Sequence, residues 1–561
     1  MYKNSQFLSG LKLHHDALFF ILCYLVLMAP YALQYIFYLP DERHYVDAAI
    51  YMLKHGDYMS PHDPDGGYRF LKPIFTYWAV FVSYKLFGIS QFSSRFPFLI
   101  AAALVLWMTY KIALLVSKDK RVAVLSLFIA GSAPIFNRAV ATSLTDIFQL
   151  LFLQMMSYGT LKIILDQGKK RKALAILYIS AGLAVTVKGI VAIAFLLVCI
   201  FFLLVNPWKR QHASDLVHLP ALLFALITGS FWYVTIFIKH GSDALSHFYG
   251  DQIGYRLTGR MLMIIKNFGY SLIVILIYLF PFLFAGWRSI FFKENRTRLK
   301  ETPHMIPVMG FFVLWIAAMI GMSSLVSQFY YRYLIPVSHI MAIIFAWFII
   351  RNEDRKSIQK LIRITVFLSF FLFFAVTSGA LIVGWKVSSG YLTTIFSCFI
   401  LIIGISLLFT LKRSSVLHNS RLIFIYMTGL FTALSFTAQP FSRPDQGEQI
   451  IESMKKMGIS QEDSVQFFGK TRIASRIRVA SKGNFYFKAL SPAAQKESAR
   501  YLIFEDTYLD SLNLSHYSVS MASAVWKRYP VEILQSQNQN ELHQVKLQNS
   551  EKYYIAKKTC N

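Results

Sequence analysis

Long apolar runs constrain this chain more than any other feature of its sequence. A run of about 18 or more apolar residues is long enough for a helix to cross a hydrocarbon core of about 30 Å. Thirteen such runs predict membrane-spanning helices over 17–38, 94–116, 121–137, 145–166, 172–188, 189–206, 217–238, 268–286, 305–326, 332–350, 361–384, 390–411 and 421–439. Because 55% of the 561 residues are hydrophobic and only 15% are charged, we expect an all-α polytopic membrane protein.

The basic residues show how these spans should be oriented. The formal net charge is +28, and the Lys and Arg residues gather in short clusters in alternate loops between the runs. Cytoplasmic loops carry an excess of Lys and Arg, so this alternation predicts a cytoplasmic N-terminus. Attraction to anionic lipid accounts for the charge, and we expect no nucleic-acid partner.

The same topology divides the chain into two parts. Residues 1–440 form the expected transmembrane domain, with extracytoplasmic loops at 41–93 and 239–267. Residues 441–561 lack long apolar runs and contain short strand-like pieces at 464–468, 484–487 and 500–504. We therefore expect a small C-terminal α/β domain on the outer side of the membrane.

Two adjacent acids, Asp41 and Glu42, follow the first span in the stretch LPDERHYVDAAIYMLKHGDY. Apolar residues then recur at helical spacing as far as Gly56, which predicts an amphipathic helix near the outer surface. Neighbouring helical residues diverge by about 100°, so the two acids cannot face one small site. One acid is expected to act in chemistry or binding, whereas the other caps or pairs. The alternative is that Asp41 is only an N-cap and Glu42 only a first-turn acid.

Three further charged residues are candidates near the predicted outer surface. Lys72 precedes Pro73 and an aromatic pair, which suits an anionic headgroup, although a lysine there can also simply snorkel. Asp146 opens the fourth span, where it is either functional or paired with the nearby Arg138. For Lys188, at the junction of the fifth and sixth spans, snorkelling is favoured over a phosphate contact.

Several short motifs together resemble a known family, the polyprenyl-phosphate-dependent membrane glycosyltransferases of the GT-C class. Within that class, the chain is similar to the lipid A aminoarabinose transferases and the related protein O-mannosyltransferases. The motifs are Asp41-Glu42 with Tyr45, Gly56-Asp57, Lys72-Pro73 with Tyr77-Trp78, Phe87-Gly88, Ser94-Arg95-Phe96-Pro97, Thr145-Asp146, Thr186-Val187-Lys188-Gly189 and RYLIP at 332–336.

The resemblance implies roles for individual residues. Asp41 would be the catalytic carboxylate, and Glu42 and Asp146 are possible second acids. The donor phosphate would be bound by three residues: Lys72, Arg256 and Tyr333. The loop around Arg256 departs from the family's pattern, because Asp251-Gln252 stands where Glu-His is expected and Arg260 lies close by. No metal ligands are assigned, and a divalent cation is the only cofactor considered.

The expected function is that of an inverting glycosyltransferase in the bacterial inner membrane. It would move a sugar from a polyprenyl-phosphate donor to lipid A, lipopolysaccharide or another envelope acceptor on the periplasmic face. A flippase or other transporter for lipid-linked sugars is the main alternative, and a protein O-glycosyltransferase is another. A transporter should show paired repeats and charges deep within its spans, whereas the distinctive residues here gather on one outer face.

Overall fold

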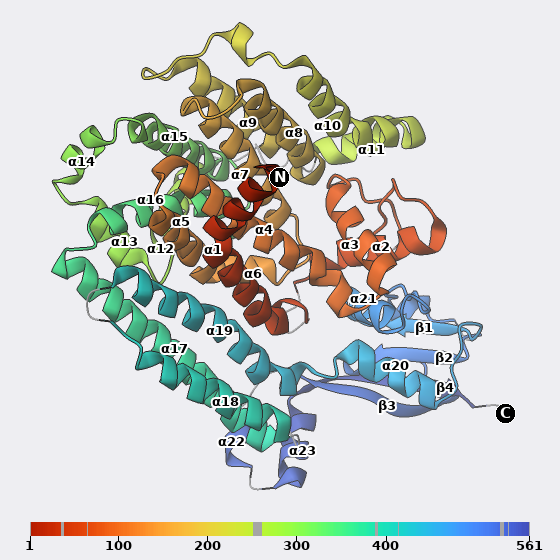
Figure 1. The fold of residues 1–561 in the computed structure, drawn as a ribbon. Helices are drawn as coiled ribbons and strands as arrows, with labels where there is room; N and C mark the ends of the chain where they lie inside the picture. Colours follow the sequence, from red (N-terminus) through yellow and green to blue (C-terminus); the bar gives the residue numbers. More distant parts are fainter. Residues whose placement is uncertain are drawn as a thin grey trace.

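The computed structural model describes a helical body and a smaller sheet domain (Figure 1). It describes residues 2–34, 39–63, 66–250, 261–387, 391–412, 415–496, 498–527, 532–536 and 538–559.

A helix or a pair of helices occupies the region of every predicted span. These elements are α1 (Tyr2–Ala32), α4 (Gln91–Ser117), α5 (Lys120–Ser132) with α6 (Pro134–Val140), α7 (Asp146–Ile164), α8 (Lys170–Lys188), α9 (Ile190–Val205), α10 (Leu219–His240), α12 (Met261–Ile277), α15 (Met305–Ser324), η3 (Tyr331–Val337) with α16 (Ser338–Arg351), α17 (Lys356–Val387), α18 (Tyr391–Leu408) and α19 (Val416–Ser442). The first span begins and ends earlier than expected, because its helix already ends at Ala32.

Not all of these helices are long and apolar enough to cross a membrane alone. Within the described residues, eight meet both requirements, and α5 with α6 makes a ninth if this pair, bent by 68°, is one span. Apolar segments of α9, α12 and α18 are shorter, and α8 begins with three cations. The chain is therefore a multi-pass membrane protein, as the apolar runs predicted.

The centre of the helical body is formed by α7 and α16. Every residue from Ser338 to Ile350 in α16 is buried, as is typical of a helix that is apolar on all sides. Close approach of neighbouring backbones also contributes, because a Cβ at Gly159 of α7 would lie 2.8 Å from the Ala173 carbonyl oxygen of α8. This close approach packs the second half of α7 against α8, whereas Asp146 is the first residue of α7.

Shorter helices connect the spans. Two of them, α2 (Glu42–His55) and α3 (Phe75–Phe87), follow α1, and α11 (Ser242–Tyr249) follows α10. The other connections contain η1 (Ala213–Leu216), α13 (Leu283–Ile290) and α14 (Asn295–Glu301).

The C-terminal domain contains a four-stranded mixed sheet, which confirms the expected α/β class. Its elements are α20 (Gln446–Lys456), β1 (Val465–Phe468), α21 (Thr471–Ala480), η4 (Pro492–Ala494), β2 (Tyr501–Glu505), η5 (Asp506–Tyr508), β3 (Tyr517–Trp526), α22 (Glu532–Gln535), α23 (Gln539–Gln548) and β4 (Ser550–Lys558). The strand order is β1-β2-β4-β3, with β1 parallel to β2 and the other pairs antiparallel.

The strand expected at 484–487 is wrong. That stretch forms no strand, and only an isolated bridge joins Phe467 to Ala489 beside it. Its aromatic residues pack on the sheet instead, with the Phe487 ring stacked 6.1 Å from that of Phe467. The alternating aromatic pattern therefore reflects packing on the sheet and not strand pairing.

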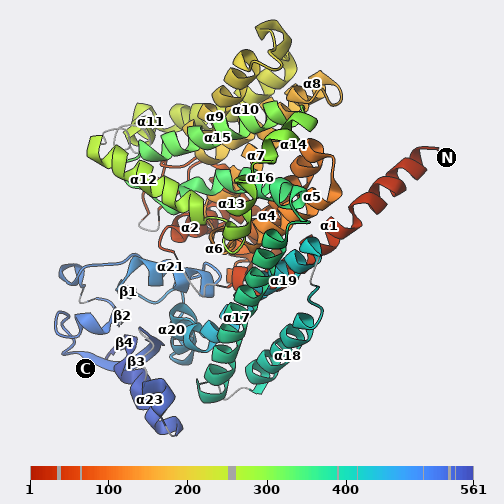
Figure 2. The same cartoon turned by 90° about the vertical axis from the view of Figure 1, so that its left-hand side faces the viewer.

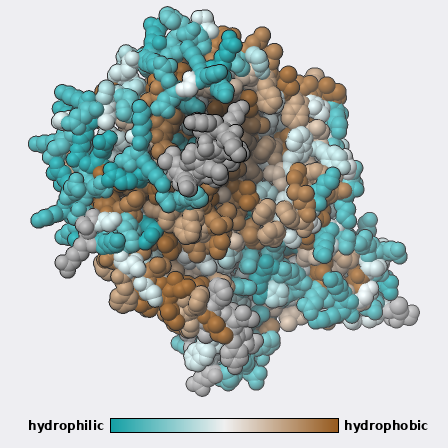
Figure 3. Space-filling model, in the orientation of Figure 1, coloured by the Kyte–Doolittle hydropathy of each residue, from teal (hydrophilic) through white to brown (hydrophobic). Residues whose placement is uncertain are grey.

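The sheet domain and the start of α1 lie on opposite sides of the helical body (Figure 2). Hydrophobic side chains cover much of the face around α17 and α18, whereas hydrophilic side chains dominate the sheet domain (Figure 3). This separation agrees with a body embedded in lipid and a domain in water.

Candidate active site

Asp41 and Glu42 point in different directions at the start of α2. The Asp41 side chain is 56% exposed, whereas that of Glu42 is fully buried. Although Asp41 occupies the N-cap position, its side chain makes no capping hydrogen bond, so capping alone does not explain it. The structure confirms that the two acids do not face one small site, whereas a role of Asp41 in chemistry or binding stays a prediction.

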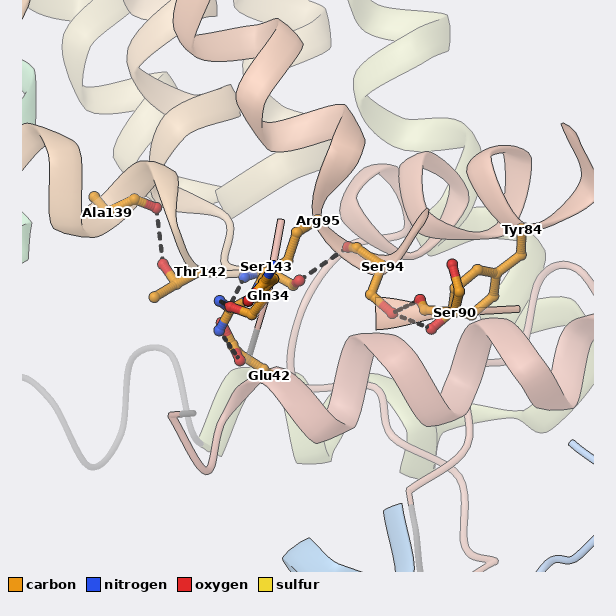
Figure 4. A network of polar contacts seen from close by, with 9 residues as sticks. All are labelled: Gln34, Glu42, Tyr84, Ser90, Ser94, Arg95, Ala139, Thr142 and Ser143. Atoms are coloured by element: carbon orange, nitrogen blue, oxygen red, sulfur yellow. Dashed lines mark hydrogen bonds and ion pairs between the residues drawn. The ribbon is translucent and has the colours of Figure 1, made fainter. Parts of the chain in front are cut away.

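Glu42 is held in a buried polar network (Figure 4). Arg95 Nη2 of α4 donates to both Glu42 carboxylate oxygens at 2.8 Å, and the Ser143 backbone N–H donates to Oε1 at 2.9 Å. Arg95 also donates to the Gln34 carbonyl oxygen, and Ser143 Oγ donates to that of Ser94. Glu42 therefore joins α2 to α4 and to the segment before α7, and its side chain does not line the cavity described next.

Asp41 instead lines a cavity of about 340 Å³, called here the outer cavity. Its lining is Asp41, Tyr45, Arg69, Leu71, Lys72, Leu144, Thr145, Asp146, Lys188, Val326, Ser327, Gln328, Tyr330, Arg332 and Tyr333. Four of the residues predicted for the site, Asp41, Lys72, Asp146 and Tyr333, are thus brought together from distant parts of the chain. Arg256 lies outside the described residues.

Lys188 and Arg332 bind the acids of the outer cavity. Lys188 Nζ lies 2.6 Å from Asp146 Oδ1 and 5.3 Å from the centre of the Tyr333 ring. Arg332 Nη2 donates to Asp41 Oδ2 at 3.0 Å, and its Nε lies 3.9 Å from Asp146 Oδ2. Of the two alternatives for Asp146, the pairing with Arg138 is therefore wrong, since the ion pairs of Asp146 are with Lys188 and Arg332. The snorkelling interpretation of Lys188 is also wrong, because its ammonium group is held inside the protein.

Sequence reasoning missed Arg332 and Arg69 as residues of the outer cavity. Arg332 directly precedes Tyr333 in RYLIP, so the motif itself contained the signal. Arg69 lies three residues before Lys72, and its Nη1 lies 3.3 Å from Asp63 Oδ1.

A short chain of contacts holds Arg69 at the wall of the outer cavity. His44 Nδ1 lies 2.6 Å from the same Asp63 oxygen that Arg69 contacts. Burial opposes ionisation of Asp63, but the hydrogen bond to His44 and the charge of Arg69 lower the pKa of its carboxyl group overall. Asp63 therefore stays ionised at neutral pH and holds Arg69 in place.

The charges of the outer cavity favour an anion. Among the described residues that line the outer cavity, there are four cations, Arg69, Lys72, Lys188 and Arg332, and two acids, Asp41 and Asp146. Because Asp63 compensates Arg69 from outside the lining, one positive charge remains in excess. Such a set suits a phosphate group, which accepts charge-assisted hydrogen bonds from Arg and Lys. Among the described residues, no group of three or more His, Cys, Asp and Glu side chains is placed to hold a metal ion.

The C-terminal domain supports α2 from the side opposite the helical body. Asp47 Oδ2 and Arg478 Nη1 of α21 form an ion pair at 2.8 Å, and both side chains are fully buried. Ser475 Oγ donates to Asp47 Oδ1 at 3.0 Å. The helix that begins beside Asp41 is therefore fixed by contacts to both domains.

Comparison with known proteins gives sequence similarity over part of the chain. Residues 71–234 match the family described as dolichyl-phosphate-mannose-protein mannosyltransferase. Two arabinosyl transferases of Proteus mirabilis that use undecaprenyl phosphate-α-4-amino-4-deoxy-L-arabinose are 23% and 25% identical, over 56% and 65% of this chain. The matched regions cover only 56% and 64% of those two relatives.

Similarity of fold extends over nearly the whole chain. The structure of ArnT from Cupriavidus metallidurans bound to undecaprenyl phosphate matches with a TM-score of 0.68 and 15% identity, covering 97% of this chain and 98% of ArnT. The apo form of the same protein matches with a TM-score of 0.66. The chain therefore has the fold of ArnT and, in residues 71–234, the sequence pattern of the dolichyl-phosphate-mannose-protein mannosyltransferase family, which confirms the resemblance inferred from its motifs.

Proposed function

We propose that this protein is an inverting glycosyltransferase that moves a sugar from a polyprenyl-phosphate donor to a cell-envelope acceptor such as lipid A. The observation that carries the proposal is the outer cavity, where an excess of cations lies beside the partly exposed carboxylate of Asp41. The arabinosyl transferase relatives and the ArnT fold support the same reaction class.

The cations suit the leaving group of such a donor. When the bond between the sugar C1 and the phosphate oxygen breaks, negative charge grows on the departing polyprenyl phosphate. Fixed cations aimed at that charge stabilise the transition state because they need no rearrangement. Lys72 is assigned to the phosphate, with Tyr333 as a hydrogen-bond donor and Arg256 as the third phosphate ligand. Arg69 and Lys188 line the same space.

An apolar groove beside the outer cavity suits the polyprenyl chain. It has a volume of about 700 Å³ and lies between α8, α9 and α10, lined almost entirely by apolar atoms from residues such as Gly182, Val185, Leu196 and Leu226. Gly189 lines the groove and directly follows Lys188, which lines the outer cavity. The anionic headgroup and the hydrocarbon tail of the donor lipid therefore have adjacent binding sites.

Asp41 is assigned to the acceptor. If the acceptor is a hydroxyl group, the Asp41 carboxylate takes its proton while the acceptor oxygen forms a bond to C1, and the electrons of the broken bond leave with the phosphate. Such a general base contributes on the order of 10²–10⁴-fold to the rate. Attack on the face of C1 opposite the leaving phosphate inverts the configuration.

The positions of the charges favour transfer over transport. A flippase would move a sugar through the body and needs polar groups along its path. The four cations and two acids of the outer cavity instead gather in one place, at the starts of α2 and α7, before α3, at the end of α8 and in η3. The excess of Lys and Arg in the loops predicted to be cytoplasmic supports a periplasmic position for the outer cavity and the C-terminal domain. A protein acceptor remains the alternative to a lipid one.

Mass spectrometry of envelope lipids and glycans tests the proposal in the native host. Strains carry the wild-type gene, a deletion, or Asp41→Asn. Loss of the same single-sugar mass in both altered strains is expected, and it identifies sugar and acceptor together. Loss of a whole polymer in the deletion strain alone, with normal lipids in the Asp41→Asn strain, would support a flippase instead.

A further inference from the structure

A second pocket lies next to the outer cavity in the helical body. It has a volume of about 70 Å³ and is called here the deep pocket. Asp146, Lys188, Val326 and Tyr333 line both spaces, so the two are adjacent and share a wall. The remaining wall of the deep pocket is formed by Gln149, Val191, Met319, Met322, Ser323, Ile335 and Pro336.

Two polar side chains in this largely apolar wall are buried without a hydrogen-bond partner among the described residues. Gln149 is 2% exposed and Ser323 is 1% exposed. Within the described part of the chain, neither amide atom of Gln149 nor the hydroxyl oxygen of Ser323 makes a hydrogen bond to protein. Burying such a group unpaired costs free energy of folding, so proteins rarely retain one without a reason.

A nearby glutamine on the same helix shows the contrast. Gln154 of α7 is also buried, but its Nε2 donates to Thr109 Oγ1 of α4 at 3.0 Å. Gln154 lines neither the outer cavity nor the deep pocket. Among the described residues, Gln154 therefore lacks a partner only at its amide oxygen, whereas Gln149 lacks one at both amide atoms.

Helical geometry places Gln149 directly below the charged site. It follows Asp146 by three residues, and residues at this spacing lie on the same face of a helix. Its amide can donate and accept hydrogen bonds, as can the hydroxyl group of Ser323. A volume of about 70 Å³ holds roughly two water-sized groups of about 30 Å³ each, which suits a substituent and not a whole sugar ring.

We propose that the deep pocket binds a hydroxyl or amino substituent of the transferred sugar and that Gln149 and Ser323 select donors by hydrogen bonding to it. The inference rests on the proposed transferase function. The sugar ring would lie in the outer cavity between Asp41 and the phosphate-binding cations, with this substituent directed past Asp146. A site built to bond a polar group discriminates strongly against an analogue that lacks it, because its own groups are then left unpaired.

The test uses the purified full-length protein and synthetic polyprenyl-phosphate sugars. Pentose, hexose and amino-sugar donors are each paired with deoxy analogues that lack one polar substituent. For at least one donor, the wild-type kcat/KM is expected to exceed that for its deoxy analogue on the order of 10–100-fold. Gln149→Met and Ser323→Ala should reduce that ratio to within about threefold. Gln154→Met is the matched control, since it removes a buried amide from the same helix and should retain the ratio.

Thermal unfolding gives a readout that does not require transfer. Sugar-bearing donors should raise the Tm of the wild-type protein more than bare polyprenyl phosphate does, and Gln149→Met should remove this difference. If the wild type shows that Gln149-dependent difference but transfers no sugar, the subsite holds and the transferase proposal fails. If bare and sugar-bearing lipids stabilise equally, or if the Gln149 and Gln154 variants behave alike, the subsite is refuted and the deep pocket holds water only.

Discussion

Arg332 Nη2 donates a hydrogen bond to Asp41 Oδ2 at 3.0 Å, across 291 positions of the sequence. The same guanidinium group lies 3.9 Å from Asp146 and 4.8 Å from the centre of the Tyr330 ring. Asp41 is thus held at the mouth of the outer cavity by a residue from the start of the span that contains α16. The carboxylate keeps a fixed orientation while more than half of its surface stays open to an acceptor.

Asp41→Asn should abolish sugar transfer without unfolding the protein. Asparagine preserves the shape of the side chain and can still accept a hydrogen bond from Arg332, but it cannot take a proton. We expect kcat to fall on the order of 10²–10⁴-fold with a hydroxyl acceptor, measured with purified protein and labelled donor. The melting temperature serves as the folding control. Near-normal turnover by this variant would remove Asp41 from the catalytic role.

Lys72→Ala should weaken use of the donor more than it affects folding. Lys72 lines the outer cavity, and its loss removes one cation from the site assigned to the phosphate. We expect a rise in KM for the lipid-linked sugar of about tenfold, since one charge-assisted hydrogen bond contributes about 1.5–3 kcal/mol. Lys85→Ala is the matched control, because Lys85 lies in the same outer segment but is exposed and lines no part of the outer cavity. Equal kinetics for the two variants would restore the snorkelling interpretation of Lys72.

Glu42→Ala should damage the fold, in contrast to Asp41→Asn. Removing the carboxylate leaves the guanidinium group of Arg95 buried without its counter-charge, which costs about 3–5 kcal/mol. We expect a large drop in melting temperature and poor membrane expression, measured by fluorescence-detected size-exclusion chromatography in detergent. A Glu42→Ala protein that is stable but inactive would instead assign Glu42 to the chemistry.

The order of the spans was predictable because apolar length and the positions of basic loops are properties of local sequence. Asp41, Lys72, Asp146 and Tyr333 could also be named, since short motifs carried them. What the sequence could not give was the pairing between distant elements. One of the two expectations for Asp146 was a pairing with Arg138, eight residues before it, but its partners are Lys188 and Arg332, which come from other spans.

Prediction of the C-terminal domain from sequence was limited in a similar way. Its α/β class followed from the loss of apolar runs and the presence of strand-like pieces. A strand was wrongly predicted at 484–487, and strands β3 and β4 were not predicted. Alternation of apolar and polar residues indicates that one side of a segment is buried, but it does not show which segment pairs with it.

Asp57 should make the stability of the folded protein depend on pH in the acidic range. Burial opposes its ionisation, but hydrogen bonds from the Ser60 side chain, the Met59 backbone and Lys239 outweigh this and lower the pKa of the carboxyl group to about 2, from an ordinary 3.8. A depressed pKa stabilises the folded form above the ordinary value, and this contribution is lost as pH falls from about 3.8 through about 2.

Asp57→Asn should flatten that acid dependence and cost about 1–2 kcal/mol at neutral pH, after discounting for partial exposure. Stability is measured by thermal unfolding between pH 2 and pH 7 in detergent. Asp243→Asn, which changes an exposed acid of α11, is the control. Identical pH profiles for both variants would contradict the assigned contacts of Asp57.

Arg478→Ala should separate the C-terminal domain from α2. The substitution leaves Asp47 buried without its counter-charge, which costs about 3–5 kcal/mol, because both side chains of the pair are fully buried. Limited proteolysis should then release residues 441–561 faster, and transfer should fall because α2 begins beside Asp41.

A double variant and a surface control make this result specific. Asp47→Leu with Arg478→Met removes both charges and should recover most of the lost stability, since no unpaired charge remains buried. Arg500→Ala breaks an exposed pair with Asp463 within the same domain and should change the protease sensitivity little. If Arg478→Ala and Arg500→Ala release the domain at the same rate, the buried pair does not hold the two parts together, and other contacts of α2, such as that of Glu42 with Arg95, must fix its orientation.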